Sequence, residues 1–392
     1  MQYIWRRNIL RLYSLGTSKI QNLKSKIQNP IMFRRRFIQT ISACAGLTLT
    51  GCGWRLADVR ATTPIKGSRD QLYLYTWTQY ADEKSILKNF TTQTGIRLFA
   101  DVYESNDAML AKVQAGGGGA YSVIYPSDYV VEQMLNGGLL AKIDRSRLIG
   151  LENLLPQFQN PIYDPNNSHS IPFTWGTTGL IYNSEILSQP PQDWEYLWQN
   201  RDRLTKRITL LDDKREVMGA VLKMLGYSYN STQEREIEQA YNKLQELKPA
   251  IAAFDTDAWR NRILAGDLYL AMCYSGDAIK ITKENPKFKY VIPKSGTSLW
   301  TDTMVIPITA PNPDGAYEWI NYTLQPDVSA KFVTTQSLAT PNRLAFESLP
   351  TRYKNNTSLF PPEDVLEKCD RIADIGDVDA VYERYWTKLK SG

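Results

Sequence analysis

Aromatic side chains and carboxylates recur together at the ends of predicted strands in this 392-residue chain. The clusters contain Trp77, Thr78, Gln79 and Tyr80; Ser127, Asp128 and Tyr129; Tyr274 and Asp277; and Trp300 and Asp302. Loops at strand ends are where α/β proteins place their ligand sites. An aromatic face attracts an organic cation, and a carboxylate pairs with its charge. The pattern therefore predicts a site for an organic ammonium ion.

Two further acids follow the predicted strand at residues 207–211. Asp213 and Glu216 are three positions apart, so both can face one side of a first helical turn. Asp212 or Asp213 is also placed to cap that helix, which is a purely structural role. We expect Asp213 and Glu216 to belong to the site, and one of the two aspartates to be the cap.

Motifs for catalysis are scarce. His169 is the only histidine, and its position in the turn at residues 165–170 predicts a surface residue without a catalytic role. The chain contains no Gly-x-Ser-x-Gly, His-Glu-x-x-His or Cys-x-x-Cys motif, which argues against hydrolytic triads, zinc chemistry and thiol redox chemistry. No cofactor and no metal are predicted. Catalysis by Asp213 and Glu216 alone stays open as an alternative.

The N-terminal segment resembles a bacterial export signal. The stretch RRRF at residues 34–37 is similar to twin-arginine signals, and the weakly apolar stretch 37–49 is too short to span a bilayer. It ends in LTGC, which resembles a lipobox and predicts lipidation of Cys52. Met32 precedes the arginines, which leaves open that residues 1–31 are a spurious upstream extension. For an exported chain, pairing of Cys273 with Cys369 also stays open.

Removal of this signal reverses the sign of the net charge. Residues 1–51 hold nine Lys and Arg and no Asp or Glu, so the net charge changes from +5 to −4. The mature chain therefore has no basic excess to support a nucleic-acid partner, and its acidic character favours a cationic ligand. Residues 52–392 are too many for one hydrophobic core and predict two domains.

Strands and helices alternate along the rest of the chain, which predicts an α/β fold with helical crossovers. Strands are predicted at 71–76, 95–102, 121–125, 172–182, 207–211, 268–274 and 303–308. Helices are predicted at 83–93, 106–114, 129–135, 216–225, 234–247, 315–324 and 326–335, and in the tail up to residue 389. The strand at 172–182 is expected to enter a second lobe, and the strand at 303–308 to return to the first.

From Leu72 to Lys390 the chain resembles the spermidine/putrescine receptors of bacterial polyamine ABC transporters. The matching stretches are LYLYTWTQY, TGIRLFADVYESND, YDPNNSHSIPFTWGTTG, LLDDKREVMGAVLKMLGYSYNST, AAFDTD, LWTDTMVIP and ATPN. The resemblance implies the two-lobed periplasmic binding protein type II fold, an α/β fold with the ligand cleft between the lobes. It places an export signal at 1–51, an anchor and linker at 52–70, lobe 1 at 71–175 plus 301–343, and lobe 2 at 176–300 plus 344–392.

The resemblance also implies roles for single residues. Trp77, Tyr80, Tyr129 and Trp300 match aromatics of the family's polyamine cleft, and Tyr274 stands where Trp is frequent. Asp213 and Glu216 match the pair that holds a terminal ammonium, Asp302 matches the acid at an inner amine, and Thr78 and Ser127 match hydroxyl contacts. Three positions differ from the family: Gln79 replaces an acid, Leu338 replaces an aromatic, and Ala373 replaces a Gln in a looser alignment. Asp277 and Asp374 are the residues near enough in sequence to compensate for them.

The family resemblance implies an extracytoplasmic, lipid-anchored solute receptor. It would capture putrescine or spermidine, pass the ligand to an ABC permease, and act as a monomer without enzymatic activity. The alternatives are a receptor for another ligand, such as ferric ion held by tyrosines, an exported carboxylate-dependent hydrolase such as a glycosidase, and a sensor with no transport role.

Overall fold

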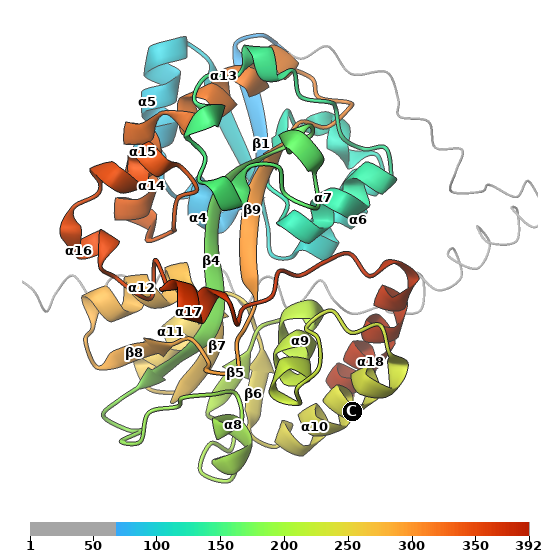
Figure 1. Ribbon diagram of the computed structural model, residues 1–392, viewed down its shortest axis with the longest axis vertical. Coiled ribbons are helices and arrows are strands. Elements are labelled where there is room, and N and C mark those ends of the chain that lie inside the picture. The colour runs from blue at the N-terminus through green and yellow to red at the C-terminus, as the bar shows by residue number, and fades with distance from the viewer. Residues whose placement is uncertain (1–67, 392) are drawn as a thin grey trace, which may run out of the picture. The chain divides into compact units, whose positions relative to one another are not determined.

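The computed structural model describes residues 68–391 (Figure 1). The predicted export signal, Cys52 and most of the predicted linker lie outside these residues. Within residues 68–391, no helix combines the length and the apolar character that crossing a bilayer requires.

The order of elements agrees with the predicted alternation. The strands are β1 (Gln71–Trp77), β2 (Arg97–Tyr103), β3 (Val123–Ile124), β4 (Ser170–Asn183), β5 (Ile208–Leu210), β6 (Ile251–Phe254), β7 (Leu270–Tyr274), β8 (Phe288–Val291) and β9 (Leu299–Val305). The helices up to residue 284 are α4 (Thr78–Ala81), α5 (Lys84–Thr94), α6 (Asn106–Gln114), α7 (Asp128–Asn136), α8 (Tyr196–Gln199), α9 (Lys214–Met224), α10 (Glu234–Leu247), α11 (Trp259–Ala265) and α12 (Ser275–Glu284). The later helices are α13 (Pro313–Leu324), α14 (Pro326–Gln336), α15 (Arg343–Ser348), α16 (Thr351–Lys354), α17 (Glu363–Leu366) and α18 (Asp379–Ser391).

The strands pair in the order β2-β1-β3-β9-β4-β7-β5-β6, and β8 also pairs with β4. Strands β4 and β9 are antiparallel and run side by side through the middle of this part of the chain (Figure 1). The first half of β4 pairs with β9, while its second half, from Thr178 to Asn183, pairs with β7 and β8. One continuous strand therefore connects two sets of strands.

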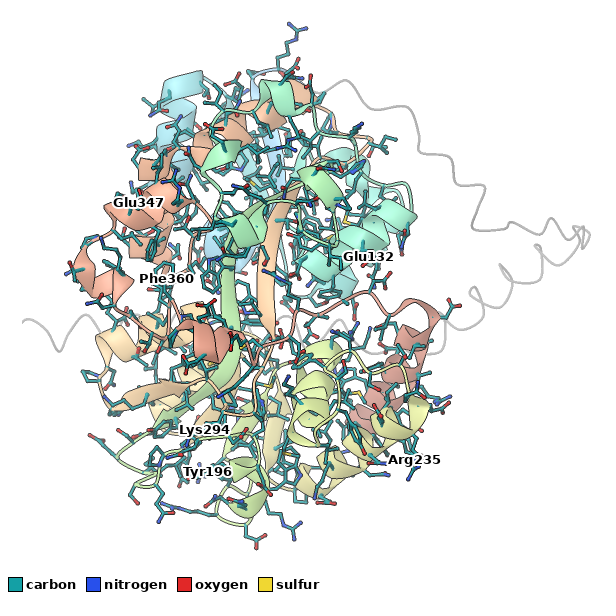
Figure 2. The ribbon with its side chains drawn as sticks, viewed as in Figure 1. Glu132, Tyr196, Arg235, Lys294, Glu347 and Phe360 are labelled. Carbon is teal, nitrogen blue, oxygen red and sulfur yellow. The ribbon has the colours of Figure 1, made fainter. Side chains whose placement is uncertain are left out.

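These two sets define the lobes. Lobe 1 here denotes β1–β3, the first half of β4, β9 and the helices α4–α7, α13 and α14. Lobe 2 denotes the second half of β4, β5–β8 and the helices α8–α12 and α18. Each lobe has its own buried apolar clusters, with Leu72, Ile306 and Trp319 in one and Leu180, Leu210 and Leu389 in the other. Charged side chains project from the surface of both lobes (Figure 2).

Local sequence explains the elements that carry the cleft. In β1, Leu72 and Leu74 are buried on one face, while on the other face Tyr73 is exposed and Tyr75 is buried. Ser105 caps α6 by accepting a hydrogen bond from the backbone N–H of Ala108 at 3.2 Å. Every residue of β4 is buried, which suits a strand covered on both sides.

The predicted return strand is shifted. We expected it at 303–308, but β9 spans Leu299–Val305. Pro307 has no N–H to donate to a neighbouring strand if β9 were longer. The buried polar residues of β9 interrupt the apolar pattern from which a buried strand is predicted. Trp300 and Asp302 therefore lie within β9 rather than in a loop before it.

The division of the two lobes into residue ranges stays a prediction. The packing of α15 and α16 bears on the boundary that was placed at residue 343. Tyr353 of α16 donates a hydrogen bond to the carbonyl of Thr334 in α14 at 3.2 Å. Leu349, between α15 and α16, is buried in one cluster with Val333 of α14. We therefore propose that the chain leaves lobe 1 after α16 rather than at residue 343.

Candidate functional site

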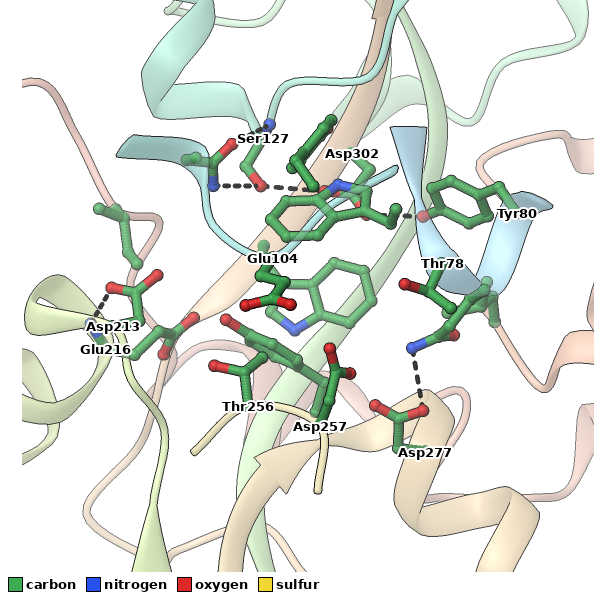
Figure 3. Close-up of a pocket in the computed structure, with 18 of the residues that line it drawn as sticks. Thr78, Tyr80, Glu104, Ser127, Asp213, Glu216, Thr256, Asp257, Asp277 and Asp302 are labelled. Atoms are coloured by element: carbon green, nitrogen blue, oxygen red, sulfur yellow. Dashed lines mark hydrogen bonds between the residues drawn. The ribbon is translucent and has the colours of Figure 1, made fainter. Parts of the chain in front are cut away.

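A cleft lies between α4, α7 and β9 of lobe 1 and α9 and α12 of lobe 2 (Figure 3). It holds about 750 Å³ of space between protein atoms, including the part open to solvent. The structure brings all the predicted ligand-binding residues together in its lining: Trp77, Thr78, Gln79, Tyr80, Ser127, Tyr129, Asp213, Glu216, Tyr274, Asp277, Trp300 and Asp302.

Asp302 is a buried carboxylate held by lobe 1. Its Oδ2 accepts a hydrogen bond from the Tyr80 hydroxyl at 2.6 Å, and its Oδ1 accepts one from the Ser127 hydroxyl at 2.9 Å. Asn106 donates to Ser127 Oγ at 3.0 Å and so fixes that hydroxyl. Burial raises the pKa of Asp302 to about 6. At neutral pH the cleft therefore contains a carboxylate that is oriented and mostly ionised.

Asp213 and Glu216 lie together at the start of α9 (Figure 3). Asp213 is the helix cap, because its Oδ1 accepts from the backbone N–H groups of Arg215 at 2.9 Å and Glu216 at 3.1 Å. Glu216 accepts from the hydroxyls of Ser298 at 2.7 Å and Tyr229 at 3.0 Å. Burial, and then the charge of Asp213, raises the pKa of Glu216 to about 8. A cation placed here would stabilise the ionised form of both acids.

The opposite side of the cleft differs in charge. Asp277, in α12, accepts a hydrogen bond from Gln79 Nε2 at 3.0 Å and pairs with Arg260 of α11 at 2.6 Å. Arg260 also pairs with Asp257 at 2.6 Å. In the view of Figure 3, Asp213 and Glu216 lie at the left and Asp277 at the lower right, with Asp302 above and between them. Only the Asp277 side has a guanidinium in its lining.

Aromatic side chains form the walls between these acids. Trp77 packs edge-on against Tyr103 with ring centroids 4.5 Å apart, and Tyr274 packs edge-on against Trp300 at 5.8 Å. The indole nitrogens of Trp77 and Trp300 are buried without a hydrogen-bond partner among the described residues. Their ring faces offer cation–π contact to a bound cation.

Of the three positions that depart from the pattern implied by the family resemblance, two line the cleft and one does not. Gln79 and Leu338 line the cleft, as the resemblance implies. Ala373 does not, and its carbonyl instead accepts from Arg215 Nη1 at 3.1 Å. Its predicted place in the site is wrong, and the neighbouring Ile372 lines the cleft. Asp374, a residue expected to compensate, accepts from Gln133 at 3.2 Å and is not in the lining.

Several lining residues were not predicted. They are Tyr103, Glu104, Asn106, Asp128, Thr256, Asp257, Arg260 and Ile372. The rule that ligands bind at strand ends would have found Glu104, after β2, and Thr256 and Asp257, after β6. Asp128 stood in a predicted cluster, but it pairs with Arg371 at 3.2 Å. That pairing makes Asp128 a poor partner for a ligand.

His169 and the cysteines lie outside this cleft. The His169 side chain is 27% exposed with Nδ1 3.5 Å from the Asp164 carboxylate, so it lies in the predicted turn but is half-buried rather than fully at the surface. Asp164 is buried and binds the backbone N–H groups of this turn, which draws the histidine inward. Cys273 and Cys369 are both free thiols, and Cys273 is buried. Among residues 68–391, no group of His, Cys, Asp and Glu is arranged to hold a metal ion.

Residues 85–361 match the family of bacterial extracellular solute-binding proteins. The chain belongs to this family. The spermidine/putrescine-binding periplasmic protein of Salmonella typhimurium is 38% identical over 324 residues, which cover 82% of this chain and 92% of that protein. The putrescine-binding periplasmic protein PotF of Escherichia coli is 31% identical over 348 residues, which cover 84% of this chain and 93% of that protein.

Structural comparison agrees with the sequence relatives. The structure of the spermidine/putrescine ABC transporter substrate-binding protein PotD from Streptococcus pneumoniae superposes with a TM-score of 0.71 and 32% identity, covering 82% of this chain and 99% of that chain. The predicted family resemblance and the two-lobed type II fold of this solute-binding protein are thereby confirmed.

Proposed function

We propose that this solute-binding protein captures a polyamine between its lobes and delivers it to an ABC permease. The observation that carries the proposal is the presence of carboxyl groups without a cationic partner at separate places along one aromatic cleft, of which Asp302 and Glu216 are buried and Asp213 is half-buried. Asp302 lies at one place, and Asp213 with Glu216 lies at another. Within residues 68–391 none of the three forms an ion pair with a Lys or Arg side chain. Such carboxylates suit a rod-like cation whose charges are separated by methylene groups.

The mechanism is selective burial without chemical change. A buried ammonium ion is costly unless a carboxylate compensates its charge. The spacing of Asp302 from the Asp213–Glu216 pair therefore selects ligands by the spacing of their nitrogens. Tyr129 and Trp300 supply cation–π contact and exclude water from the ion pairs. Closure of the lobes completes these contacts, because the acids come from different lobes.

The chain's place in the cell forms the second part of the proposal. Lipidation of Cys52 would hold the receptor at the extracytoplasmic face of the membrane, next to the permease. The receptor would act as a monomer, without a cofactor, a metal or a nucleic-acid partner. The relatives named above are transport receptors, which favours this function over ferric-ion binding and over hydrolysis by Asp213 and Glu216.

Calorimetric titration of the purified protein tests the proposal. Putrescine, cadaverine, spermidine and spermine form one series, and ferric ion and a neutral oligosaccharide serve as separate probes. We expect binding within the polyamine series and neither binding of ferric ion nor cleavage of the oligosaccharide. A protein that binds no member of the series, or that turns over the oligosaccharide, is not a polyamine receptor.

A further inference from the structure

One end of the cleft already contains a cation that belongs to the protein. Arg260 of α11 pairs through Nη2 with Asp277 and through Nη1 with Asp257, both at 2.6 Å. The Arg260 side chain is 27% exposed, and that of Asp277 is 4% exposed. Both acids at this end therefore have a cationic partner before any ligand enters.

The neighbouring residues add no free negative charge at this end. Gln79 donates from Nε2 to Asp277 Oδ1 at 3.0 Å, so both oxygens of Asp277 are engaged. Leu338 fills the space over Gly276, where an added Cβ would lie 2.7 Å from Leu338 Cδ2. This end is thus lined by an apolar side chain, a neutral amide and a paired carboxylate.

Among the other acids of the lining, Asp128 pairs with Arg371, and Glu104 is exposed to solvent. Asp302, Asp213 and Glu216 have no cationic partner among the described residues. Asp302 is bound by two hydroxyls, Asp213 by two backbone N–H groups, and Glu216 by two hydroxyls. These contacts orient the three carboxyl groups but bring no positive charge to them. The cleft therefore offers two places for a ligand ammonium, at Asp302 and at the Asp213–Glu216 pair.

We propose that Arg260 determines specificity by taking the place of a third ligand ammonium, so that the cleft selects diamines over triamines. This inference rests on the proposed polyamine function. The third ammonium of a triamine would approach the Arg260 guanidinium, and like charges in a desolvated site repel strongly. A diamine ends before this region and meets only uncompensated acids. Selectivity arises here from repulsion of the wrong ligand as much as from attraction of the right one.

Calorimetry with putrescine and spermidine on Arg260 variants tests the inference. Arg260→Gln removes the cation and frees Asp277 and Asp257, so the ratio of spermidine affinity to putrescine affinity should rise at least about tenfold. Arg260→Lys keeps a positive charge at this position, so the ratio of spermidine affinity to putrescine affinity should stay as in the parent. The double variant Arg260→Gln with Asp277→Asn lacks the freed acid, and most of the gain should disappear. Circular dichroism confirms that each variant is folded.

The outcomes separate this inference from the proposed function. If the parent binds neither amine, the polyamine function fails and the inference fails with it. If the parent binds both amines and Arg260→Gln changes both affinities equally, only the inference is overturned. If Arg260→Gln does not fold, the ratio of spermidine affinity to putrescine affinity in the parent protein decides the inference. Spermidine bound more than about tenfold more tightly than putrescine would exclude a repelling guanidinium at the third nitrogen.

Discussion

Asp302 is the residue on which capture of a cation depends most directly. Asp302→Asn keeps the shape of the side chain but removes its charge, and a buried ammonium then retains its desolvation cost without a partner. We expect polyamine binding to weaken by roughly 2–5 kcal/mol, measured by calorimetry. His169→Ala is the control, because His169 lies outside the cleft, and it should leave the affinity unchanged. Equal affinity of Asp302→Asn and the parent would show that no ligand cation is held there.

Glu216 should make binding depend on pH. Burial and Asp213 raise its pKa to about 8 in the ligand-free cleft, so it is mostly protonated at neutral pH. An ammonium ion favours the ionised form, and binding therefore releases a proton. Affinity should rise from about pH 6 to about pH 8 and level off above the free-state pKa.

Titration in two buffers of different ionisation enthalpy measures this proton release directly. Glu216→Gln should remove most of the release at about pH 8 and flatten the upper part of the pH profile, while the release by Asp302 near its own pKa of about 6 remains. A parent protein that takes up protons on binding, or that shows the same profile as Glu216→Gln, would contradict the assignment.

Gln79 should set how well a long polyamine is tolerated. The amide lies beside Asp277 and supplies no negative charge at a position where the family resemblance implies an acid. Gln79→Glu should raise spermidine affinity more than putrescine affinity, and more at low salt than at high salt because charge interactions are screened. Calorimetry with both amines at two salt concentrations gives the comparison. An equal effect on the two amines would place residue 79 away from the distal nitrogen.

At the scale of elements, the pairing of β4 with β9 positions the aromatic wall. Gly176 of β4 lies opposite Trp300 of β9, and a Cβ at residue 176 would clash with the Trp300 indole and lie 2.6 Å from Ser275 Oγ. Gly176→Ala should therefore displace the indole, lower the free energy of unfolding by about 1–3 kcal/mol and weaken polyamine binding. Urea unfolding and calorimetry measure the two effects.

Gly137→Ala is the matched control for that substitution. Gly137 is exposed at the end of α7 with φ −79°, and an added Cβ would meet its nearest neighbours at 3.4 Å. Gly137→Ala should change the free energy of unfolding and the free energy of polyamine binding by no more than about 0.5 kcal/mol each. If the two alanine variants behave alike, Trp300 tolerates the added methyl group and the packing argument is wrong.

Elements with a clear periodic pattern could be predicted from the sequence, and short ones could not. The predicted helices at 106–114 and 234–247 coincide with α6 and α10. Helix α11 was missed, since its seven residues are too few for a pattern before Gly266 ends it in a left-handed conformation. The ion pairs of Arg260 could not be predicted either, because they depend on how α11 lies beside α12.

At the scale of the whole molecule, the anchor decides where the receptor works. Cys52 lies outside the described residues, and its lipidation stays a prediction from the LTGC stretch. Mass spectrometry of the membrane fraction should show a diacylglyceryl group on Cys52 as the first residue. Cys52→Ser should leave the precursor uncleaved. A soluble mature form that begins well beyond residue 52 would show that Cys52 is not a lipid anchor.

The antiparallel pairing of β3 with β9 also governs the order in which the chain can fold. Ile124 pairs with Val305, so the sheet of lobe 1 is completed only after most of the chain has left the ribosome. Until then β3 presents an open edge, which can recruit other chains, and pairings of such long range form slowly. Most of lobe 2 comes from residues between these two strands and does not wait for β9.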